Sequence, residues 1–134
     1  MNESIVRSKG NQNSYKKSEQ GWIFVHVEGN SGARGFDYGY LLADEIVNAI
    51  SDAKKLIEIQ TGVPWEFFVQ NEASIIHTWK EHLNSDKYFT FYVELLGIAD
   101  GVRKARPDSN ISIDDIILWN GYEELTDYWF PTFA

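Results

Sequence analysis

The chain contains no cysteine at any of its 134 positions. This absence excludes disulfide bonds, thiolate metal sites and a cysteine nucleophile within the chain itself. Methionine occurs once and proline three times. No apolar run approaches the roughly 20 residues that a membrane-spanning helix needs, and the first residues lack the apolar core of a secretory signal peptide. Any chemistry must therefore rest on other residue types or on another polypeptide.

Basic residues are also scarce, with 12 Lys and Arg against 20 Asp and Glu, which gives a net charge of −8. Four of these basic residues fall within residues 1–20, so the rest of the chain is strongly acidic. Such a surface repels phosphate backbones and anionic lipids, so we expect neither a nucleic acid nor a membrane as partner. The aromatic fraction of 15% is enough for a bulky core or for a surface kept for a partner or ligand.

Polarity along the chain predicts a flexible polar tail over residues 1–20 and one folded domain over residues 21–134. A run of aromatic and β-branched residues at 22–27 predicts a strand closed by a turn. Apolar side chains occur on both faces of this strand, so we expect both faces to be covered.

Apolar periodicity predicts four helices, at residues 34–60, 64–83, 86–105 and 113–125. Ser31 is expected to cap the first helix and Gly62 to end it, and Pro64 is expected to open the second. Ser112 and Asp115 match a capping box for the fourth. Residues 126–134 should be extended. The predicted fold class is α+β, mostly α with one strand, and a lone strand needs partners from another chain.

Glycines four positions apart occur twice in predicted helices, as Gly35 and Gly39 and again as Gly97 and Gly101. Each glycine costs about 1 kcal/mol in helix propensity, so close approach of a neighbouring element is the expected reason. The two smooth helix faces could pack against each other. The Gly32 to Gly39 stretch matches neither a phosphate loop nor a dinucleotide fingerprint, which leaves packing as the preferred interpretation.

Candidate chemical groups are few. His77 and His82 are five apart on one helix, a spacing unlike that of helical zinc ligands, so we expect no metal. Asp114 and Asp115 fit the first turn of a helix, where the helix dipole favours negative charge. Asn120, Tyr122 and Glu124 form a polar run that suits either a site or a solvated helix end. No serine lies in a nucleophile elbow.

Three ordered stretches resemble the isopenicillin N acyltransferase family and its bacterial relatives labelled phospholipase B-like. The first is Gly21–Gly29 followed by Arg34-Gly-Phe-Asp-Tyr-Gly39, which resembles the family's opening strand and helix start. The second is Tyr92-Val-Glu-Leu-Leu-Gly-Ile-Ala-Asp-Gly101, and the third runs from Ile116 to Pro131. The resemblance covers about residues 21–131.

The resemblance implies an N-terminal-nucleophile (Ntn) hydrolase or acyltransferase acting on linear amide or acyl bonds, without a cofactor. Family members are precursors that cut themselves before a cysteine, whose thiol is the nucleophile and whose α-amine moves the proton. The implied fold is a four-layer αββα sandwich, with this chain as the smaller α subunit of a heterodimer. No cysteine follows Ala134, so the nucleophile is expected on the second chain. Supporting or substrate-pocket roles are expected for Asn120, Tyr122, Glu124, Tyr128, Trp129 and Phe130.

Packing against the second chain would explain the same six residues. A competing hypothesis is a non-enzymatic helical domain that binds a protein partner through its aromatic C-terminal segment. A phospholipase activity is a third hypothesis, although no residue favours a lipid over an amide. The polar start of the chain fits removal of an export signal, which favours a periplasmic or secreted bacterial enzyme over a cytoplasmic one.

Overall fold

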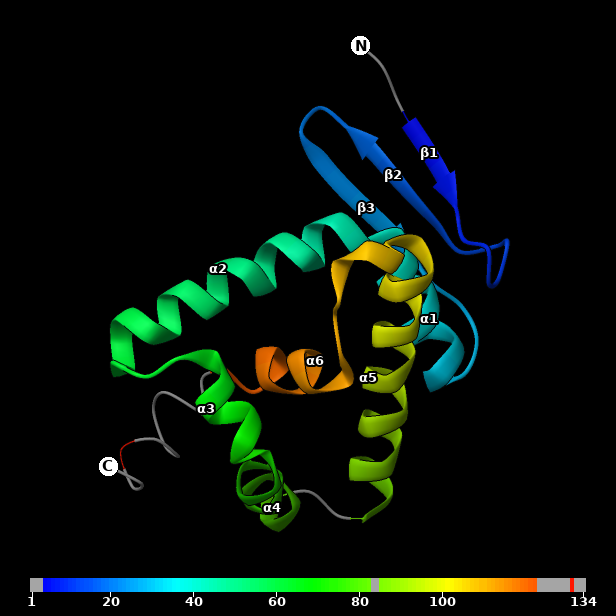
Figure 1. Cartoon of the computed structure of the whole chain (residues 1–134). Coiled ribbons are helices and arrows are strands. Elements are labelled where there is room, and N and C mark those ends of the chain that lie inside the picture. The colour runs from blue at the N-terminus through cyan, green and yellow to red at the C-terminus, as the bar shows by residue number, and fades with distance from the viewer. Residues whose placement is uncertain (1–3, 83–84, 123–130, 132–134) are drawn as a thin grey trace.

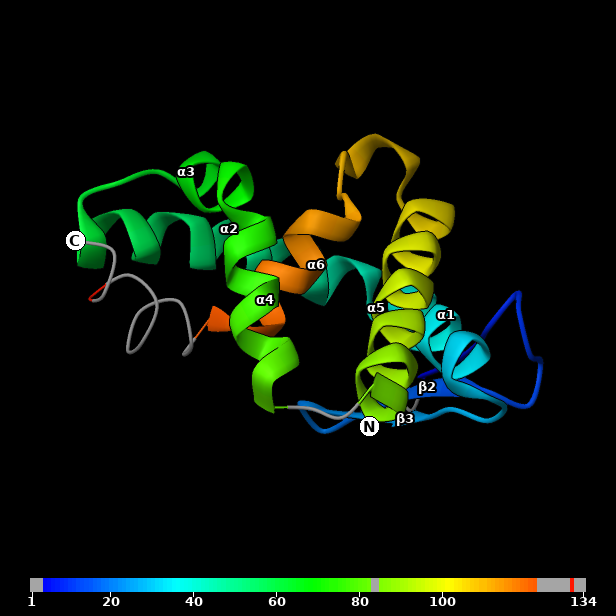
Figure 2. The same cartoon turned by 90° about the horizontal axis from the view of Figure 1, so that it is seen from below.

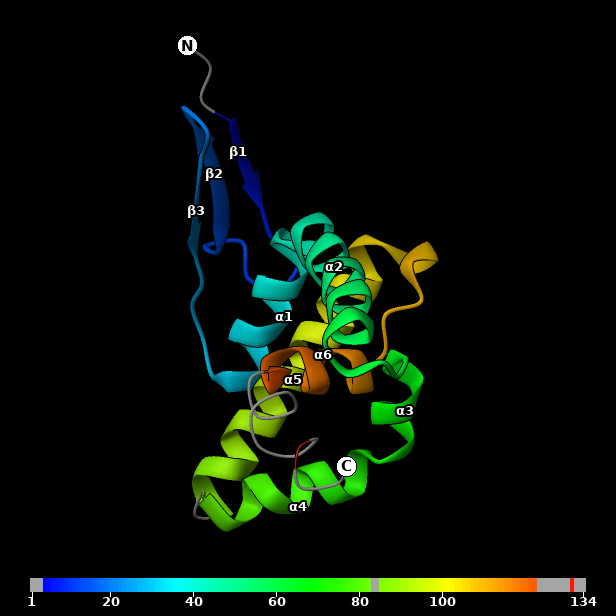
Figure 3. The same cartoon turned by 90° about the vertical axis from the view of Figure 1, so that its left-hand side faces the viewer.

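The computed structural model describes residues 4–82, 85–122 and 131. This part of the chain is α+β, with a helical body and a small antiparallel sheet that projects from it (Figure 1). Seen from the side, the sheet lies along one flank of the body, and most of its surface stands clear of the helices (Figure 3). The α+β class predicted from the sequence is therefore confirmed at this level.

Three strands form the sheet in the order β1 (Ser4–Arg7), β2 (Tyr15–Glu19) and β3 (Trp22–His26). Both pairs are antiparallel, with Glu19 opposite Trp22 next to the turn. That turn is made by Gln20 and Gly21, whose φ angles of 53° and 83° suit a two-residue hairpin of the primed type. The predicted flexible tail and the predicted lone strand were therefore wrong, because residues 4–19 supply β2, which pairs with β3, and β1, which pairs with β2.

The predicted helix at 34–60 is two helices, α1 (Ser31–Leu41) and α2 (Ala43–Thr61), separated at Leu42. No proline lies at Leu42, and the helical spacing of apolar residues continues through this position. The sequence pattern therefore predicted one helix where there are two. Asn30, rather than Ser31, caps α1 by accepting a hydrogen bond of 2.9 Å from the Ala33 N–H. Gly62 ends α2 in the left-handed conformation at φ 78°, as predicted.

The next predicted helix is also divided, into α3 (Trp65–Gln70) and α4 (Glu72–His82). Asn71 separates them, and its side-chain amide donates to the Phe67 carbonyl at 2.7 Å. That local bond competes with a continuous helix, which is a known behaviour of asparagine. Pro64 lies at the N-cap of α3, one position before its expected place in the first turn.

The last two helices follow the prediction more closely. Helix α5 (Ser85–Ala105) is confirmed to within one residue, and a short 3-10 turn, η1 (Pro107–Ser109), follows it. Helix α6 (Ile113–Asn120) begins with the predicted capping box between Ser112 and Asp115. Gly121 is its C-cap, so α6 is shorter than the predicted 113–125, of which residues 123–125 lie outside the described part.

Helices α1 and α5 lie side by side through the four glycines, as the sequence predicted (Figure 2). A Cβ placed on Gly39 would lie 2.1 Å from the Ile98 carbonyl oxygen, and one on Gly101 would lie 2.1 Å from the Phe36 carbonyl oxygen. Both distances are far inside van der Waals contact, so the two backbones approach each other where side chains are missing. This contact joins two of the stretches that carry the family resemblance.

The hydrophobic core lies among the helices rather than under the sheet. Helix α6 runs through the middle of the body, with α2, α3, α4 and α5 around it (Figures 1 and 2). Burial of these apolar side chains supplies most of the driving force for folding. The largest fully buried apolar side chains come from these five helices and are Ile46, Ile50, Ile57, Phe68, Ile75, Leu95, Val102, Ile116 and Leu118.

Asp37 of α1 ties the β1–β2 connection to the helical body. Its carboxylate is buried and accepts from the Ser8 hydroxyl at 2.5 Å, the Ser14 hydroxyl at 2.7 Å and the Asn11 N–H at 3.1 Å. Ser14 Oγ also accepts from the Glu28 N–H at 3.1 Å, which joins the segment after β3 to the same cluster. A buried carboxylate needs such donors, so these bonds hold the base of the sheet on α1.

Candidate functional site

The sheet presents an uncovered outer face. Cross-strand register places Ile5, Lys17 and Phe24 together on this face, with Trp22 next to Phe24 along β3. Trp22 is 72% exposed, Phe24 56% and Ile5 51%. Tyr15 stacks on His26 on the same face, with ring centroids 5.5 Å apart. Large apolar side chains grouped in this way mark an interaction surface rather than an ordinary solvated face.

The opposite, inner face is only partly covered. Lys16 on this face forms an ion pair with Glu45 of α2, which shows that it is turned toward the helices. Ile23 and Val6 nevertheless remain exposed there. Within the described residues, the outer edges of β1 and β3 pair with no other strand. The predicted cover on both sides of β3 is thus not supplied by the described part of this chain.

Two of the six predicted site residues can be placed, and the hydrogen bonds described for them do not join them to each other. Asn120 is exposed at the end of α6, where its amide donates to the Ile116 carbonyl at 2.8 Å. The Tyr122 hydroxyl donates to Gln60 Oε1 at 2.7 Å, and partial burial raises the pKa of Tyr122 above its usual value. Asn120 thus bonds within its own helix, whereas Tyr122 bonds to the last turn of α2. Glu124, Tyr128, Trp129 and Phe130 lie outside the described residues.

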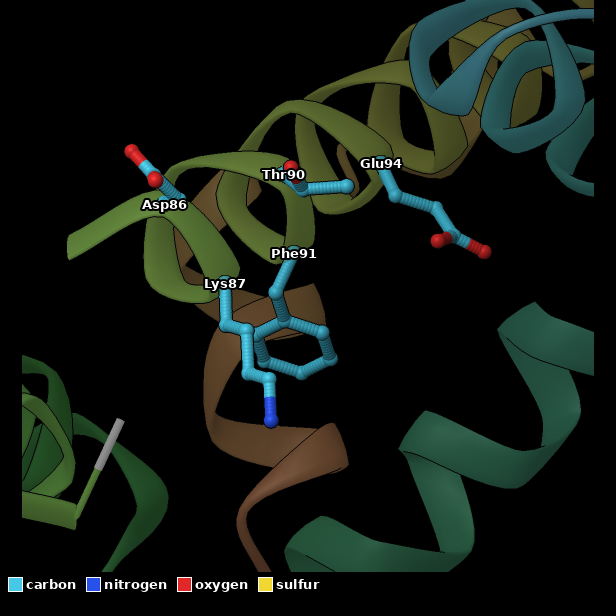
Figure 4. A pocket seen from close by; sticks show the side chains of 5 residues that line it. All are labelled: Asp86, Lys87, Thr90, Phe91 and Glu94. Carbon is cyan, nitrogen blue, oxygen red and sulfur yellow. The ribbon is translucent and has the colours of Figure 1, made fainter. Parts of the chain in front are cut away.

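A shallow hollow of about 340 Å³ lies along α5. Lys87 and Phe91 extend from the helix into this hollow, and Glu94 lies one turn further along (Figure 4). Asp86 and Thr90 complete the described lining. The hollow combines charges of both signs with one aromatic ring. The five lining residues include no histidine and no serine, so they do not form a nucleophile–base pair.

A carboxyl cluster surrounds the N-terminus of α6. Asp115 closes the capping box with Ser112 and accepts from Trp65 Nε1 at 2.9 Å, and Lys54 Nζ lies 3.8 Å from it. Glu72 lies in the first turn of α4, and its Oε1 atom is buried without a hydrogen-bond partner among the described residues. Burial first, and then the neighbouring carboxyl groups of Asp114 and Asp115, raise the pKa of Glu72 to about 8.

Histidines and acidic groups do not combine into a metal site in the described part of the chain, where no three of them are placed to hold an ion. His26 instead pairs with Glu28, at 3.4 Å between Nε2 and Oε1. None of the helices over the described ranges is both long and apolar enough to cross a membrane.

Comparison with known proteins gives no significant match, either to a protein-family model or to a curated protein.

Two residues important to this geometry escaped the sequence analysis. Asp37 lies inside the Arg34 to Gly39 motif, and only the fold shows that it binds Ser8 and Ser14. Glu72 lies 42 positions from Asp114 in the sequence, so no local pattern connects the two. The sequence did hold one clue to Asp37. It lies two residues from both Gly35 and Gly39, on a helix expected to pack closely against another element.

Proposed function

We propose that this chain is the α subunit of a self-cleaving cysteine Ntn hydrolase or acyltransferase that acts on linear amide or acyl bonds. The observation that carries this proposal is the sheet, whose outer face exposes Trp22, Phe24 and Ile5 and whose edges pair with no other strand of the described residues. A three-stranded sheet with an apolar face needs a second layer for stability. A second polypeptide from the same precursor would supply that layer.

The paired glycine motifs give the proposal a second support. Arg34 to Gly39 and Glu94 to Gly101 are the two compact motifs of the resemblance, and they meet along the α1–α5 contact. In this proposal the pair forms a rigid scaffold on which the sheet is mounted through Asp37. The reacting groups belong to the second chain. Its N-terminal thiol would attack the substrate carbonyl, its α-amine would carry the proton, and water or an amine would release the acyl group.

Expression of the gene together with the sequence downstream of Ala134 tests the proposal. We expect intact-mass spectrometry under denaturing conditions to show two polypeptides, and N-terminal sequencing to find cysteine at the start of the larger one. Replacing that cysteine by alanine should leave a single uncut precursor without amidase activity. A single uncut polypeptide that is soluble and monomeric would overturn the proposal and favour a binding domain.

The sheet should be the contact surface for the second chain. We expect Phe24→Asp to weaken association with the second chain at least about 30-fold, the effect of losing a ~2 kcal/mol interface residue. The stability of the isolated chain should change little, because Phe24 is already exposed in it. Titration calorimetry with the separated chains measures the change.

Ile59→Asp is the matched control, since Ile59 is 80% exposed on α2 and away from the sheet. It should bind like the parent. Equal loss of affinity in both variants would show that the outer sheet face is not the contact surface.

A further inference from the structure

Strand β3 forms an open edge of the sheet. Among the described strands it pairs only with β2, and Figure 3 shows it on the side of the sheet turned away from the helices. Its sequence, Trp22-Ile-Phe-Val-His26, contains no proline, lysine, aspartate or glutamate. Proteins usually protect an edge strand with such residues or with a bulge. The lysines of the sheet, Lys16 and Lys17, lie instead on the central strand β2, where they cannot protect this edge.

The ladder between β2 and β3 shows which backbone groups of β3 face outward. Glu19 is opposite Trp22 beside the two-residue turn, and the closing pair of such a hairpin exchanges both of its N–H···O bonds. Hydrogen-bonded pairs alternate along an antiparallel ladder, so Phe24 also directs its backbone groups toward β2. Ile23 and Val25 therefore direct their N–H and C=O groups away from β2, where no described strand meets them.

The opposite edge of the sheet is less suited to pairing. Strand β1 has four residues, and one of them is the charged Arg7. The Arg7 guanidinium lies over the Tyr15 ring, 5.8 Å from its centroid, and donates to the Gln12 carbonyl at 3.2 Å. A charged side chain on an edge strand disfavours the addition of another strand. Of the two edges, β3 is the one that can accept a new strand.

We propose that the β3 edge pairs with the β3 edge of a second copy of this chain, antiparallel and with Phe24 opposite Phe24, so that the two sheets become one. The contact is isologous, with the two-fold axis at Phe24. The inference does not depend on the proposed function, because it concerns the backbone edge of β3 and not the outer face of the sheet.

The strand is complementary to itself in this register. Ile23 of each copy meets Val25 of the other, and these are the residues whose backbone groups face outward, so each pair exchanges two N–H···O bonds. Trp22 meets His26, so no two like charges are opposed. The Phe24 side chains meet in a non-hydrogen-bonded pair, where side chains come closest. A two-fold axis at Ile23 or Val25 would leave part of β3 opposite the turn or the segment after β3.

Single-cysteine variants test the register, because the chain has no cysteine of its own. Mild oxidation of the folded 134-residue chain should convert most of the Phe24→Cys protein into a disulfide-linked dimer, since the two Cα atoms would lie about 4.5 Å apart. Trp22→Cys is the matched control on the same strand. Its two copies would lie more than about 10 Å apart, so it should cross-link to itself at least about tenfold less. Mixing Trp22→Cys with His26→Cys should restore the cross-link, as intact-mass spectrometry would show.

The unchanged chain gives a check that needs no substitution. Sedimentation equilibrium should show a monomer–dimer equilibrium, and hydrogen exchange of the Ile23 and Val25 amides should slow at least about tenfold when the chain is mostly dimeric. Val25→Pro removes an outward N–H without removing a bond to β2, and should weaken the dimer at least about tenfold. Ile5→Pro is its control at the β1 edge and should not, because Lys17 opposite Ile5 directs its backbone groups toward β3.

Three results would overturn the proposal. The first is a chain that stays monomeric at concentrations up to about 1 mM, where even a weak pairing is populated. The second is a dimer in which the Ile23 and Val25 amides exchange as fast as in the monomer, because the copies would then pack through another surface. The third is equal cross-linking of Phe24→Cys and Trp22→Cys.

Discussion

Gly101→Ala is expected to destabilise the chain by about 3 kcal/mol or more, despite the ~1 kcal/mol that alanine gains in helix propensity. The new methyl group would lie 2.1 Å from the Phe36 carbonyl oxygen and 2.6 Å from the Tyr40 nitrogen. These are backbone atoms of α1, so no side-chain rotation can make room. The helices must separate, and separation removes contacts along the whole α1–α5 interface.

Gly32→Ala is the matched control, because Gly32 lies in α1 at the same interface but has more room. Its added Cβ would lie 3.4 Å from Val93 Cγ1, an ordinary contact. We expect this variant to be neutral or up to about 1 kcal/mol more stable. Urea unfolding followed by circular dichroism measures both. A Gly101→Ala protein within 0.5 kcal/mol of the parent, on the order of a neutral surface substitution, would show that the interface is loose.

Asp37→Ala should release the base of the sheet from α1. Removal of the carboxylate leaves the Ser8 hydroxyl, the Ser14 hydroxyl and the Asn11 N–H without their acceptor in a buried place. Hydrogen bonds to a charged group contribute about 1.5–3 kcal/mol each, and they act together here, so we expect a total loss of about 3 kcal/mol or more. Asp37→Asn keeps the shape of the side chain, but its NH₂ group would face the hydroxyl and N–H donors that Asp37 accepts from. It should therefore restore little of the stability lost in Asp37→Ala.

Two measurements separate local release from global unfolding. Urea unfolding reports the total stability, and hydrogen exchange of the β2 amides reports whether the sheet separates while the helical body remains folded. Asp52→Asn, on the exposed surface of α2, is the control and should match the parent in both. Unchanged β2 protection in Asp37→Ala would contradict the anchoring role.

The sequence predicted the features that depend on local chemistry. Ser112 and Asp115 formed the expected capping box, Gly62 ended α2, and the glycine spacing of four found its partner across the α1–α5 contact. Each of these features follows from residue type and spacing, which can be read from the sequence before the fold is known.

The features that depend on tertiary contacts were missed. Leu42 carries no helix-breaking signal, so nothing local in the sequence marks the break between α1 and α2. Residues 4–19 looked like a tail because their strands are polar and half exposed, and their stability comes from β3 and Asp37. Of the predicted site, Asn120 bonds to the Ile116 carbonyl within α6, and Tyr122 bonds to Gln60 of α2, 62 positions away in sequence.

The glycine contact between α1 and α5 has a consequence for how the chain can vary in length. It joins residues about 60 positions apart, so everything from Leu42 to residue 84 is a loop in the topological sense, closed by the helix pair. The entropy of closing such a loop grows only logarithmically, and doubling its length costs about 0.6 kcal/mol. The connection at Gly62 can therefore accept insertions at small thermodynamic cost, whereas one methyl group at Gly39 or Gly101 cannot be accommodated.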